Sequence, residues 1–348
     1  MFENIHIDHF RGIKSCQIDG LEQVNLFFGK NNCGKSSVLE GLFLLSGQSN
    51  PSLPITINNM RSYFRFSEMD FGIDFYNLNT AIPIVISTGG AMKRTLKISL
   101  MQSKGNEVSL NSLVNETSSV ATKYYGLTLQ YTLGDDGNTI YKSEIILKEG
   151  EEGKGKTNID KRYHEHVFSQ YFPSNSMGIS VQTKFAKVVE NKQENNILKA
   201  LQVIEPKILD IQLVGNELMV DIGLPQRLPI NVMGDGIRKL LSIILSIYES
   251  KDGILLIDEV DNGFHYSAMK PLWKAVLHAA KKYNTQVFVS THNIDSLKGL
   301  VAVLDENDNY RPIVSAFKLI KHPTDEVKAL KYGYEEMAYA IAQEMEMR

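Results

Sequence analysis

Cysteine is scarce in this 348-residue chain, which contains only Cys16 and Cys33. Cys16 falls in a predicted strand and Cys33 in a glycine-rich loop, so we expect no structural disulfide and a reducing compartment. Long apolar runs are also absent, because none approaches the roughly 18 residues of a membrane-spanning helix. The first residues lack the basic region and apolar core of a signal peptide. We therefore expect a soluble, cytoplasmic protein without a membrane partner.

An excess of one charge is missing as well. Lys and Arg number 37 against 40 Asp and Glu, which gives a formal net charge of −3. This balance excludes the overall basic footprint of a dedicated nucleic-acid binder, although a local basic patch remains open. The sequence shows no internal repeat and no sustained heptads, so long coiled-coil arms are not expected. The length allows one large α/β domain or two ordinary ones.

The chain does contain a motif for binding phosphate. Residues 29–37 read GKNNCGKSS and fit the pattern G-x-x-x-x-G-K-[ST]. The segment before them, 24–28, is short, apolar and β-prone, and the segment after them, 37–45, has apolar residues at helical spacing. A loop between strand and helix directs backbone N–H groups and a helix N-terminus at an anion. We expect Lys35 to reach the β- and γ-phosphates of a nucleotide and the Ser36 hydroxyl to bind Mg²⁺.

An apolar strand that ends in two acids is the second feature. Residues 254–257 read ILLI, and Asp258 and Glu259 follow directly. Ligands of open α/β sheets bind at the carboxyl ends of parallel strands, which is where these carboxylates are expected. Asp258 is suited to hold Mg²⁺, directly or through water, and Glu259 to orient or deprotonate an attacking water. Together with the phosphate motif, this arrangement predicts phosphoryl transfer.

Two shorter motifs accompany these. His292 follows a predicted strand at 286–290, and an imidazole there could hydrogen-bond a γ-phosphate or an attacking water. A lone histidine is more often structural, but its place at a strand end favours the functional interpretation. Residues 234–236 read GDG before a predicted helix at 237–248. They form either an ordinary flexible cap or a second anion site built from glycine amides and a helix N-terminus.

The remaining pattern predicts an α/β chain with an antiparallel part. Further strands are expected at 5–10, 14–18, 82–87, 95–101, 125–131, 140–147, 208–213, 217–222 and 314–320. Further helices are expected at 60–68, 180–201 and 266–283, with a short one near the C-terminus. The acidic stretch 305–308 is interpreted as a turn between strands rather than a metal cluster.

The order GKNNCGKSS, MGDGIRK, ILLIDEVDNGFH and VSTHN resembles the ABC-type ATPases of the RecF/SMC/OLD branch. It is most similar to short bacterial OLD-like ATP-binding proteins of AAA type that lack a Toprim domain. The resemblance spans nearly the whole chain, starting at Phe10-Arg11-Gly12-Ile13. It implies an α/β P-loop fold of ABC type, in which a mixed central sheet is flanked by helices and accompanied by an antiparallel β subdomain and a helical signature lobe.

The resemblance also implies a division of the chain. Residues 1–348 would form a single ABC-type ATPase domain. Within it, 1–48 and 251–320 would be the nucleotide-binding core, 49–172 an antiparallel β-rich part, 173–250 the helical lobe and 321–348 a C-terminal tail.

The same resemblance assigns site residues. Lys35, Glu259 and His292 would be catalytic, with His292 as the switch histidine, and Ser36 and Asp258 would bind the metal. Asp261 would contact the other subunit, and Arg11 resembles an arginine that lies near the nucleotide in relatives. The residues expected to contact ATP are Arg11, Gly29, Asn31, Asn32, Cys33, Gly34, Lys35, Ser36, Ser37, Met233, Gly234, Asp235, Gly236 and Asp261.

Two departures from the family pattern stand out. The signature at residues 233–239 lacks the Ser-Gly-Gly start of transport ATPases, so its γ-phosphate contacts would come mainly from the backbone. No glutamine is clearly placed as the metal-sensing residue, and Gln170 is the nearest candidate.

About fifty residues follow His292, too few for a separate Toprim nuclease domain by ordinary domain sizes. Nuclease activity would then belong to a separate Toprim-like partner.

The leading hypothesis is an Mg-ATP-dependent switch. ATP would join two copies head to tail, hydrolysis would release them, and an effector protein or DNA would read the difference, in anti-phage defence or DNA repair. A nucleotide-binding subunit of a transporter is the second hypothesis. The third is a non-hydrolysing scaffold or sensor held together by ATP, which the presence of Glu259 and His292 disfavours.

Overall fold

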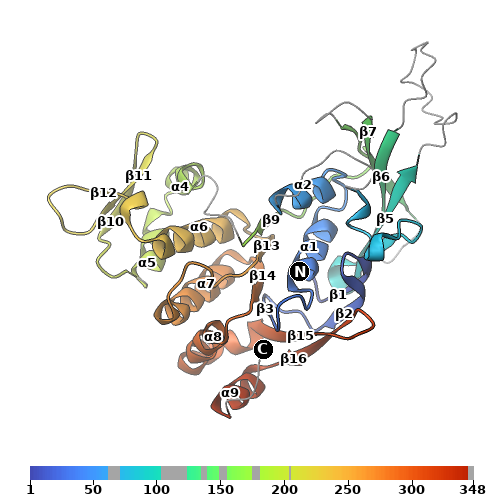
Figure 1. Ribbon diagram of the computed structural model, residues 1–348. Helices are drawn as coiled ribbons and strands as arrows, with labels where there is room; N and C mark the ends of the chain where they lie inside the picture. Colours follow the sequence, from blue (N-terminus) through green and yellow to red (C-terminus); the bar gives the residue numbers. More distant parts are fainter. Residues whose placement is uncertain are drawn as a thin grey trace.

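Five parallel strands carry the motifs found in the sequence. In the computed structural model they lie in the order β15 (Val314–Lys321), β3 (Val24–Phe28), β14 (Gln286–Thr291), β13 (Ile254–Ile257) and β9 (Ser169–Phe172) (Figure 1). Every residue of β3, β13 and β14 is buried, as expected of parallel strands that are covered on both faces. The structure describes residues 1–61, 71–102, 124–134, 139–148, 155–174, 181–203 and 205–343.

The same sheet continues beyond β15 as a mostly antiparallel wing. Its strands are, in spatial order, β16 (Glu326–Tyr332), β2 (Ile13–Asp19), β1 (Asn4–Phe10), β4 (Ile84–Thr88), β5 (Arg94–Gln102), β6 (Tyr124–Leu133), β7 (Tyr141–Lys148) and β8 (Lys156–Asn158). β16 is antiparallel to β15 and parallel to β2. The β15–β16 hairpin therefore joins the parallel strands to the wing.

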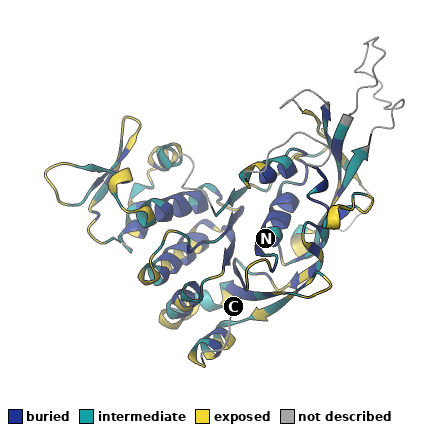
Figure 2. Ribbon diagram, viewed as in Figure 1, coloured by how far each residue is buried: buried dark blue, intermediate teal, exposed yellow. Residues whose placement is uncertain are grey.

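Helices cover both faces of the parallel strands (Figure 2). α1 (Lys35–Ser46) packs on one face, where Phe27 belongs to the same buried cluster. α6 (Asp235–Glu249), α7 (Met269–Tyr283) and α8 (Ile294–Glu306) pack on the other face with Leu26 and Phe28. Since side chains alternate along a strand, β3 contributes to both cores.

A smaller lobe lies beside α6 (Figure 1). It contains α4 (Val181–Glu190), α5 (Glu194–Gln202) and a three-stranded sheet in the order β10 (Asp210–Val214), β11 (Glu217–Asp221) and β12 (Leu228–Pro229). The other elements are α2 (Leu53–Met60), α9 (Tyr334–Ala342) and the 3₁₀ turns η1 (Tyr76–Leu78), η2 (Gly90–Met92), η3 (Ile230–Val232), η4 (Tyr266–Ala268) and η5 (Asp308–Ile313). In the described part of the chain, no helix is long and apolar enough to cross a membrane.

The predicted fold class is confirmed, with corrections to individual elements. The single helix expected at 180–201 is two helices, because Lys192 adopts a left-handed conformation with φ 54° between α4 and α5. α8 was not predicted, so the acidic stretch 305–308 is not a turn between strands: Asp305 and Glu306 end α8, Asn307 is its C-cap, and Asp308 begins η5. The expected tail contains β16 and α9. The helix expected at 60–68 lies largely outside the described residues, and α2 precedes it.

A cluster of buried charges fixes the tip of the β1–β2 hairpin. The Arg11 guanidinium lies 3.1 Å from Glu40 on α1 and 3.3 Å from Asp74, and it donates a hydrogen bond of 2.7 Å to Asn58. Glu40 also accepts a hydrogen bond from Arg61. Burial raises the pKa of Asp74 to about 6, although Arg11 opposes this shift. The hairpin, α1 and α2 are thereby connected through groups that water does not screen.

Replacing Phe27 with Ala should destabilise the protein by about 3–5 kcal/mol, as is typical when a buried aromatic side chain is removed. The Phe27 ring stacks on Phe288 with centroids 6.3 Å apart and contacts Phe317 at 5.7 Å, so the substitution opens a cavity under three adjacent strands. Urea unfolding measures the effect. Ile320→Ala, at a 42% exposed position on β15, is the control and should change stability little. Equal unfolding midpoints for the two variants would contradict this packing.

Asp74→Asn should change how stability depends on pH. The pKa of Asp74 is higher in the folded chain than in an unfolded one, so its favourable contribution is complete below about pH 4 and is lost as the pH rises through about 6. The free energy of unfolding of the wild type, minus that of Asp74→Asn, should fall across this window by an amount on the order of 3 kcal/mol or less. Denaturant titrations at several pH values test this. A constant difference would refute the raised pKa.

Candidate functional site

The phosphate motif forms a tight loop between β3 and α1. Gly29 has φ 143° and Gly34 has φ 99°, which are conformations that side-chain-bearing residues rarely adopt. A Cβ on Gly29 would lie 2.6 Å from the carbonyl oxygen of Leu319 on β15, so this position also lacks room for a side chain. Gly34 is the N-cap of α1. The predicted strand–loop–helix context is therefore present, with the N-terminus of α1 at the end of the loop.

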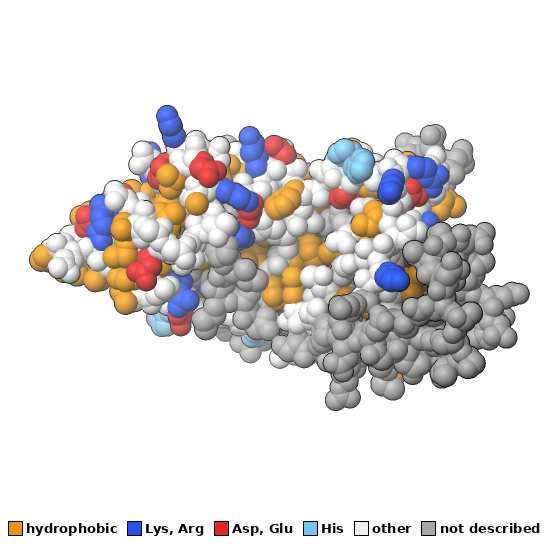
Figure 3. Space-filling model, turned by 90° about the horizontal axis from the view of Figure 1, so that it is seen from above, with side chains coloured by type: hydrophobic (Ala, Val, Ile, Leu, Met, Phe, Trp, Pro, Cys, Tyr) orange, Lys and Arg blue, Asp and Glu red, His pale blue; other side chains and the backbone are white. Residues whose placement is uncertain are grey.

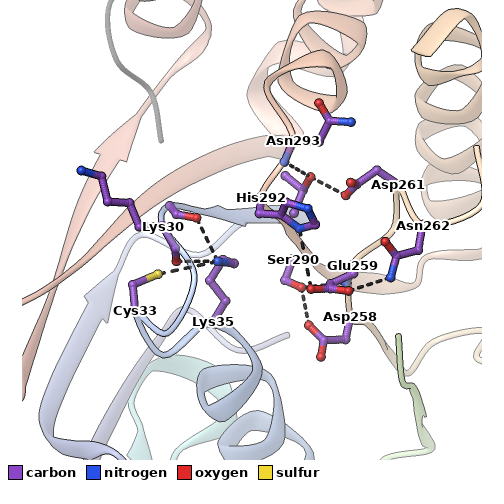
Figure 4. Close-up of polar contacts among 12 residues, drawn as sticks. Lys30, Cys33, Lys35, Asp258, Glu259, Asp261, Asn262, Ser290, His292 and Asn293 are labelled. Carbon is purple, nitrogen blue, oxygen red and sulfur yellow. Dashed lines mark hydrogen bonds and ion pairs between the residues drawn. The ribbon is translucent and has the colours of Figure 1, made fainter. Parts of the chain in front are cut away.

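Lys35 is buried at the start of α1 (Figure 4). Its ammonium group donates hydrogen bonds to the carbonyl oxygens of Gly29 at 2.9 Å and Lys30 at 2.8 Å, within its own loop. The thiol of Cys33 lies 3.8 Å from the same ammonium group. Burial raises the pKa of this thiol, which favours its neutral form, so Cys33 fills space in the loop.

The other loop residues differ in exposure. Asn31 and Asn32 are exposed, and Asn32 has a left-handed φ of 62°. Ser36 and Ser37 are partly exposed in the first turn of α1. This turn therefore presents hydroxyl groups and backbone N–H groups together, as a phosphate with a divalent cation requires.

Asp258 lies at the carboxyl end of β13 and is connected to the neighbouring strands on both sides. The Ser290 hydroxyl on β14 donates to Asp258 Oδ1, and the Tyr171 hydroxyl on β9 donates to Oδ2 at 3.4 Å. Ser290 Oγ also accepts the backbone N–H of Glu259 at 2.8 Å. Sequence reasoning assigned no role to Ser290 or Tyr171, because each contact crosses between strands that are distant in the chain.

Glu259 begins a turn of residues 259–264, which we call the Glu259 turn. Its φ is 48°, a left-handed conformation that costs on the order of 1–3 kcal/mol for a residue other than glycine. Its carboxylate accepts a hydrogen bond of 2.6 Å from the Asn262 side chain and lies 3.6 Å from Nδ1 of His292 (Figure 4). The structure thus brings together the predicted catalytic glutamate and the predicted switch histidine. Both are partly exposed.

Asp261 is buried within the same turn. The Thr291 hydroxyl at the end of β14 donates to Asp261 Oδ1, and the Asn293 backbone N–H donates to Thr291 Oγ1 at 3.0 Å. Asn293 in turn caps α8 by accepting the Asp295 N–H. The end of β14 and the start of α8 therefore fix both the Glu259 turn and His292. Because this carboxylate has an internal partner, the expected contact of Asp261 with another subunit stays a prediction.

The predicted signature, residues 233–239, begins at the N-terminus of α6, and we call its first four residues, 233–236, the signature segment. Gly234 is the N-cap, and Asp235 is exposed beside it. Met233 and Gly236 are partly exposed. A Cβ on Gly236 would lie 3.4 Å from the Phe264 ring, so the signature packs beside the Glu259 turn of its own chain. A helix N-terminus with open space around Gly234 is thus available at the surface.

Two sequence candidates are engaged elsewhere. The Arg11 guanidinium contacts Glu40, Asp74 and Asn58, so its proximity to a nucleotide remains a prediction. The Gln170 amide donates to Glu249 and its oxygen accepts from Lys184. Gln170 on β9 pairs with Leu255 on β13, and Leu255 precedes Asp258 by three residues. The structure therefore places Gln170 inside β9 and away from the strand end that Asp258 follows, so its role as the metal-sensing residue stays a prediction.

The chain resembles known proteins over most of its length. The model of the family described as "AAA domain, putative AbiEii toxin, Type IV TA system" matches residues 24–297. An ATP/GTP phosphatase of Helicobacter pylori is 26% identical over 335 residues, which is 88% of this chain and 90% of that protein. The DNA replication and repair protein RecF of Ruminiclostridium cellulolyticum is 21% identical over 224 residues, which is 63% of this chain and 50% of RecF.

Solved structures show the same fold. The SMC head bound to the C-winged helix domain of ScpA has a TM-score of 0.52 at 9% identity, covering 97% of this chain and 99% of that chain. An SMC head with an extended coiled coil, bound to the C-terminal domain of ScpA derived from Pyrococcus furiosus, has a TM-score of 0.50 at 10% identity and covers 99% of both chains. The chain therefore belongs to this AAA-domain family and has the P-loop, ABC-type ATPase fold of the RecF/SMC branch.

Proposed function

We propose that the chain binds Mg-ATP at residues 29–37 and hydrolyses it at the carboxyl ends of β3, β13 and β14. One observation carries this proposal: these three strands are parallel neighbours in the sheet. The phosphate loop, the Asp258–Glu259 pair and His292 therefore emerge at one edge. A relative of nearly equal length is named an ATP/GTP phosphatase, which supports the same activity.

The loop residues fit a nucleotide triphosphate. The backbone N–H groups of the loop and the N-terminus of α1 would bind the phosphates. The Lys35 ammonium, which donates to the carbonyl oxygens of Gly29 and Lys30, would donate to phosphate oxygens in their place. The Ser36 hydroxyl and the Asp258 carboxylate would hold Mg²⁺, and such oxygen donors are the ligands that it prefers. When bound, Mg²⁺ offsets the charge of the phosphate oxygens. The described residues contain no cluster of three or more metal-binding side chains, in keeping with a cation held largely by its nucleotide.

Glu259 acts as the general base. In the proposed reaction its carboxylate orients the attacking water and accepts a proton from it. Asn262 and His292 flank that carboxylate and limit its orientation, since they lie 2.6 and 3.6 Å from its two oxygens. The His292 imidazole lies at the same edge, where it could hydrogen-bond a γ-phosphate or the attacking water. The preorganised turn therefore supplies position rather than covalent chemistry, as phosphoryl transfer requires.

The site is completed by a second copy of the chain in this proposal. Gly234 and Asp235 are exposed at a helix N-terminus, which favours an anion. Apart from the adjoining residues, no atom of the described chain lies within 4 Å of a Cβ built on Gly234. The γ-phosphate on one copy would fit against this helix end of the other copy. ATP would then assemble a head-to-tail homodimer, and hydrolysis would separate it.

A separate effector protein or DNA would bind the ATP-assembled dimer and the separated copies differently. The RecF relatives are named for DNA replication and repair, which supports a DNA transaction, and a Toprim-like nuclease in anti-phage defence is the alternative effector. On the face shown in Figure 3, the basic side chains are interspersed with acidic ones. The described side chains of that face therefore do not form the single-sign patch that attracts DNA most strongly.

Lys35→Ala should weaken ATP binding by about 100-fold or more, because charge-assisted hydrogen bonds are worth about 1.5–3 kcal/mol each and at least two are lost. Titration calorimetry measures the affinity. Lys274→Ala, at an exposed position on α7, is the control and should bind ATP as the wild type does. If Lys35→Ala retained wild-type affinity, residues 29–37 would not be the nucleotide site.

Glu259→Gln should retain ATP binding while hydrolysis falls by about 10²- to 10⁴-fold, the usual contribution of a general base. With turnover blocked, an ATP-bound dimer should accumulate in analytical ultracentrifugation. The matched control adds Gly234→Trp, which the open space allows in the monomer but which obstructs the signature. The double variant should bind ATP and stay monomeric. Wild-type turnover by Glu259→Gln would remove Glu259 from its role, and dimers of the double variant would remove the signature from the interface.

A further inference from the structure

Lys239 is a buried cation that connects α6 to the Glu259 turn. It lies 9% exposed, a little more than one turn after Gly234. Its ammonium group donates to the backbone carbonyl oxygens of Glu259 at 3.2 Å and Asn262 at 2.7 Å. It also lies 5.7 Å from the centroid of the Phe264 ring. One side chain therefore contacts the first, fourth and last residues of the turn.

Burial of this charge requires compensation. Desolvation lowers the pKa of Lys239 to about 8, although the carboxylates of Asp261, Glu259 and Asp258 attract its charge. An unpaired buried ammonium would cost several kcal/mol, so carbonyl oxygens and nearby acids must stabilise it. A leucine or methionine could fill the same space without that cost. The arrangement is therefore better explained by what the ammonium does to the turn than by packing.

The turn needs such support because Glu259 is in a left-handed conformation. A strained backbone conformation of this kind persists only where several contacts with the surrounding structure stabilise it. Ser290 fixes the backbone N–H of Glu259, and Lys239 fixes its carbonyl oxygen. The Asn262 side chain donates to the Glu259 carboxylate, and the Asn262 carbonyl oxygen accepts a hydrogen bond from Lys239. The direction of the Glu259 carboxylate therefore depends on where Lys239 lies.

Lys239 and the signature segment, residues 233–236, meet in the same rigid element. α6 begins at Asp235, directly after Gly234, and continues without interruption through Lys239. Gly236 also packs against Phe264. A shift of the helix N-terminus by an anion would move Lys239 with it, because packed helices transmit displacements as units.

We propose that Lys239 is a positioning residue that couples the signature segment, residues 233–236, to the Glu259 turn of the same chain. The inference deepens and rests on the proposed function. In a head-to-tail dimer, the signature of one copy meets the nucleotide of the other copy. Engagement of that nucleotide would then set the catalytic carboxylate at the first copy's own site, so that the two sites of a dimer act together.

Amide hydrogen exchange of the peptide containing residues 258–265, measured in the nucleotide-free protein, tests whether Lys239 stabilises the Glu259 turn. Lys239→Met should exchange faster there, and Lys239→Arg should restore much of the protection, because it keeps a cationic donor. Lys270→Met is the control: Lys270 is 44% exposed and pairs with Glu306 on the surface. If Lys239→Met does not fold, Lys239→Gln replaces it, as a neutral side chain with a single amide donor group. Wild-type protection in the neutral variant would overturn the proposal.

ATP then tests the coupling. In the wild type, ATP should slow exchange of this peptide, and kinetics should show cooperativity between the two sites. Lys239→Met should keep the affinity for ATP, lose the ATP-dependent protection, and lower kcat by about 10- to 100-fold, as loss of a supporting partner typically does. An equal ATP response in Lys239→Met would overturn the coupling. A wild type without ATPase activity would refute the proposed function and, with it, the coupling, while nucleotide-free exchange still decides whether Lys239 supports the turn.

Discussion

The parallel hydrogen-bond ladder through β3, β14 and β13 is the constraint on which the rest of the structure depends. β14 pairs with β3 on one side and with β13 on the other, so the ends of the three strands keep one register. Every residue of these strands is buried, and separating them would expose backbone groups that have no other partner. The loop with Lys35 and the Asp258–Glu259 pair are thus fixed relative to each other by backbone rather than by side-chain contacts.

The polar network at that edge shows how strain is distributed. Glu259 is left-handed, and its neighbours compensate: Ser290 bridges Asp258 and the Glu259 N–H, and Asn262 holds the carboxylate. Sites of this kind combine a costly backbone conformation with several satisfied hydrogen bonds. The geometry of the carboxylate is therefore set before any ligand arrives. Preorganisation is the usual source of electrostatic catalysis in phosphoryl transfer.

Sequence reasoning placed the elements that contiguous residues encode, and it missed the contacts between residues that are distant in the chain. The loop at 29–37, the strand before Asp258 and the place of His292 depend on contiguous residues, and the structure brings them together. Tyr171, Ser290 and Lys239 act through partners 87, 32 and 20 residues away, respectively, which no local pattern encodes. Arg11 and Gln170 were assigned from the family pattern; each contacts other side chains in the structure, and their assigned roles remain predictions. α8 was not predicted, although Asn293 supplies a local start signal by accepting the Asp295 N–H.

The β15–β16 hairpin has a consequence for where a functional unit of this chain ends. β15 pairs with β3, and its Leu319 carbonyl backs Gly29, while β16 pairs with β2. A fragment that stopped after α8 would still carry every nucleotide-binding motif in its sequence. It would nevertheless lack β15, which packs against Gly29, and the parallel strands would no longer be hydrogen-bonded to the antiparallel wing. The motifs alone therefore do not define the smallest part of the chain that folds, because that part extends past the last motif, at His292, to include β15 and β16.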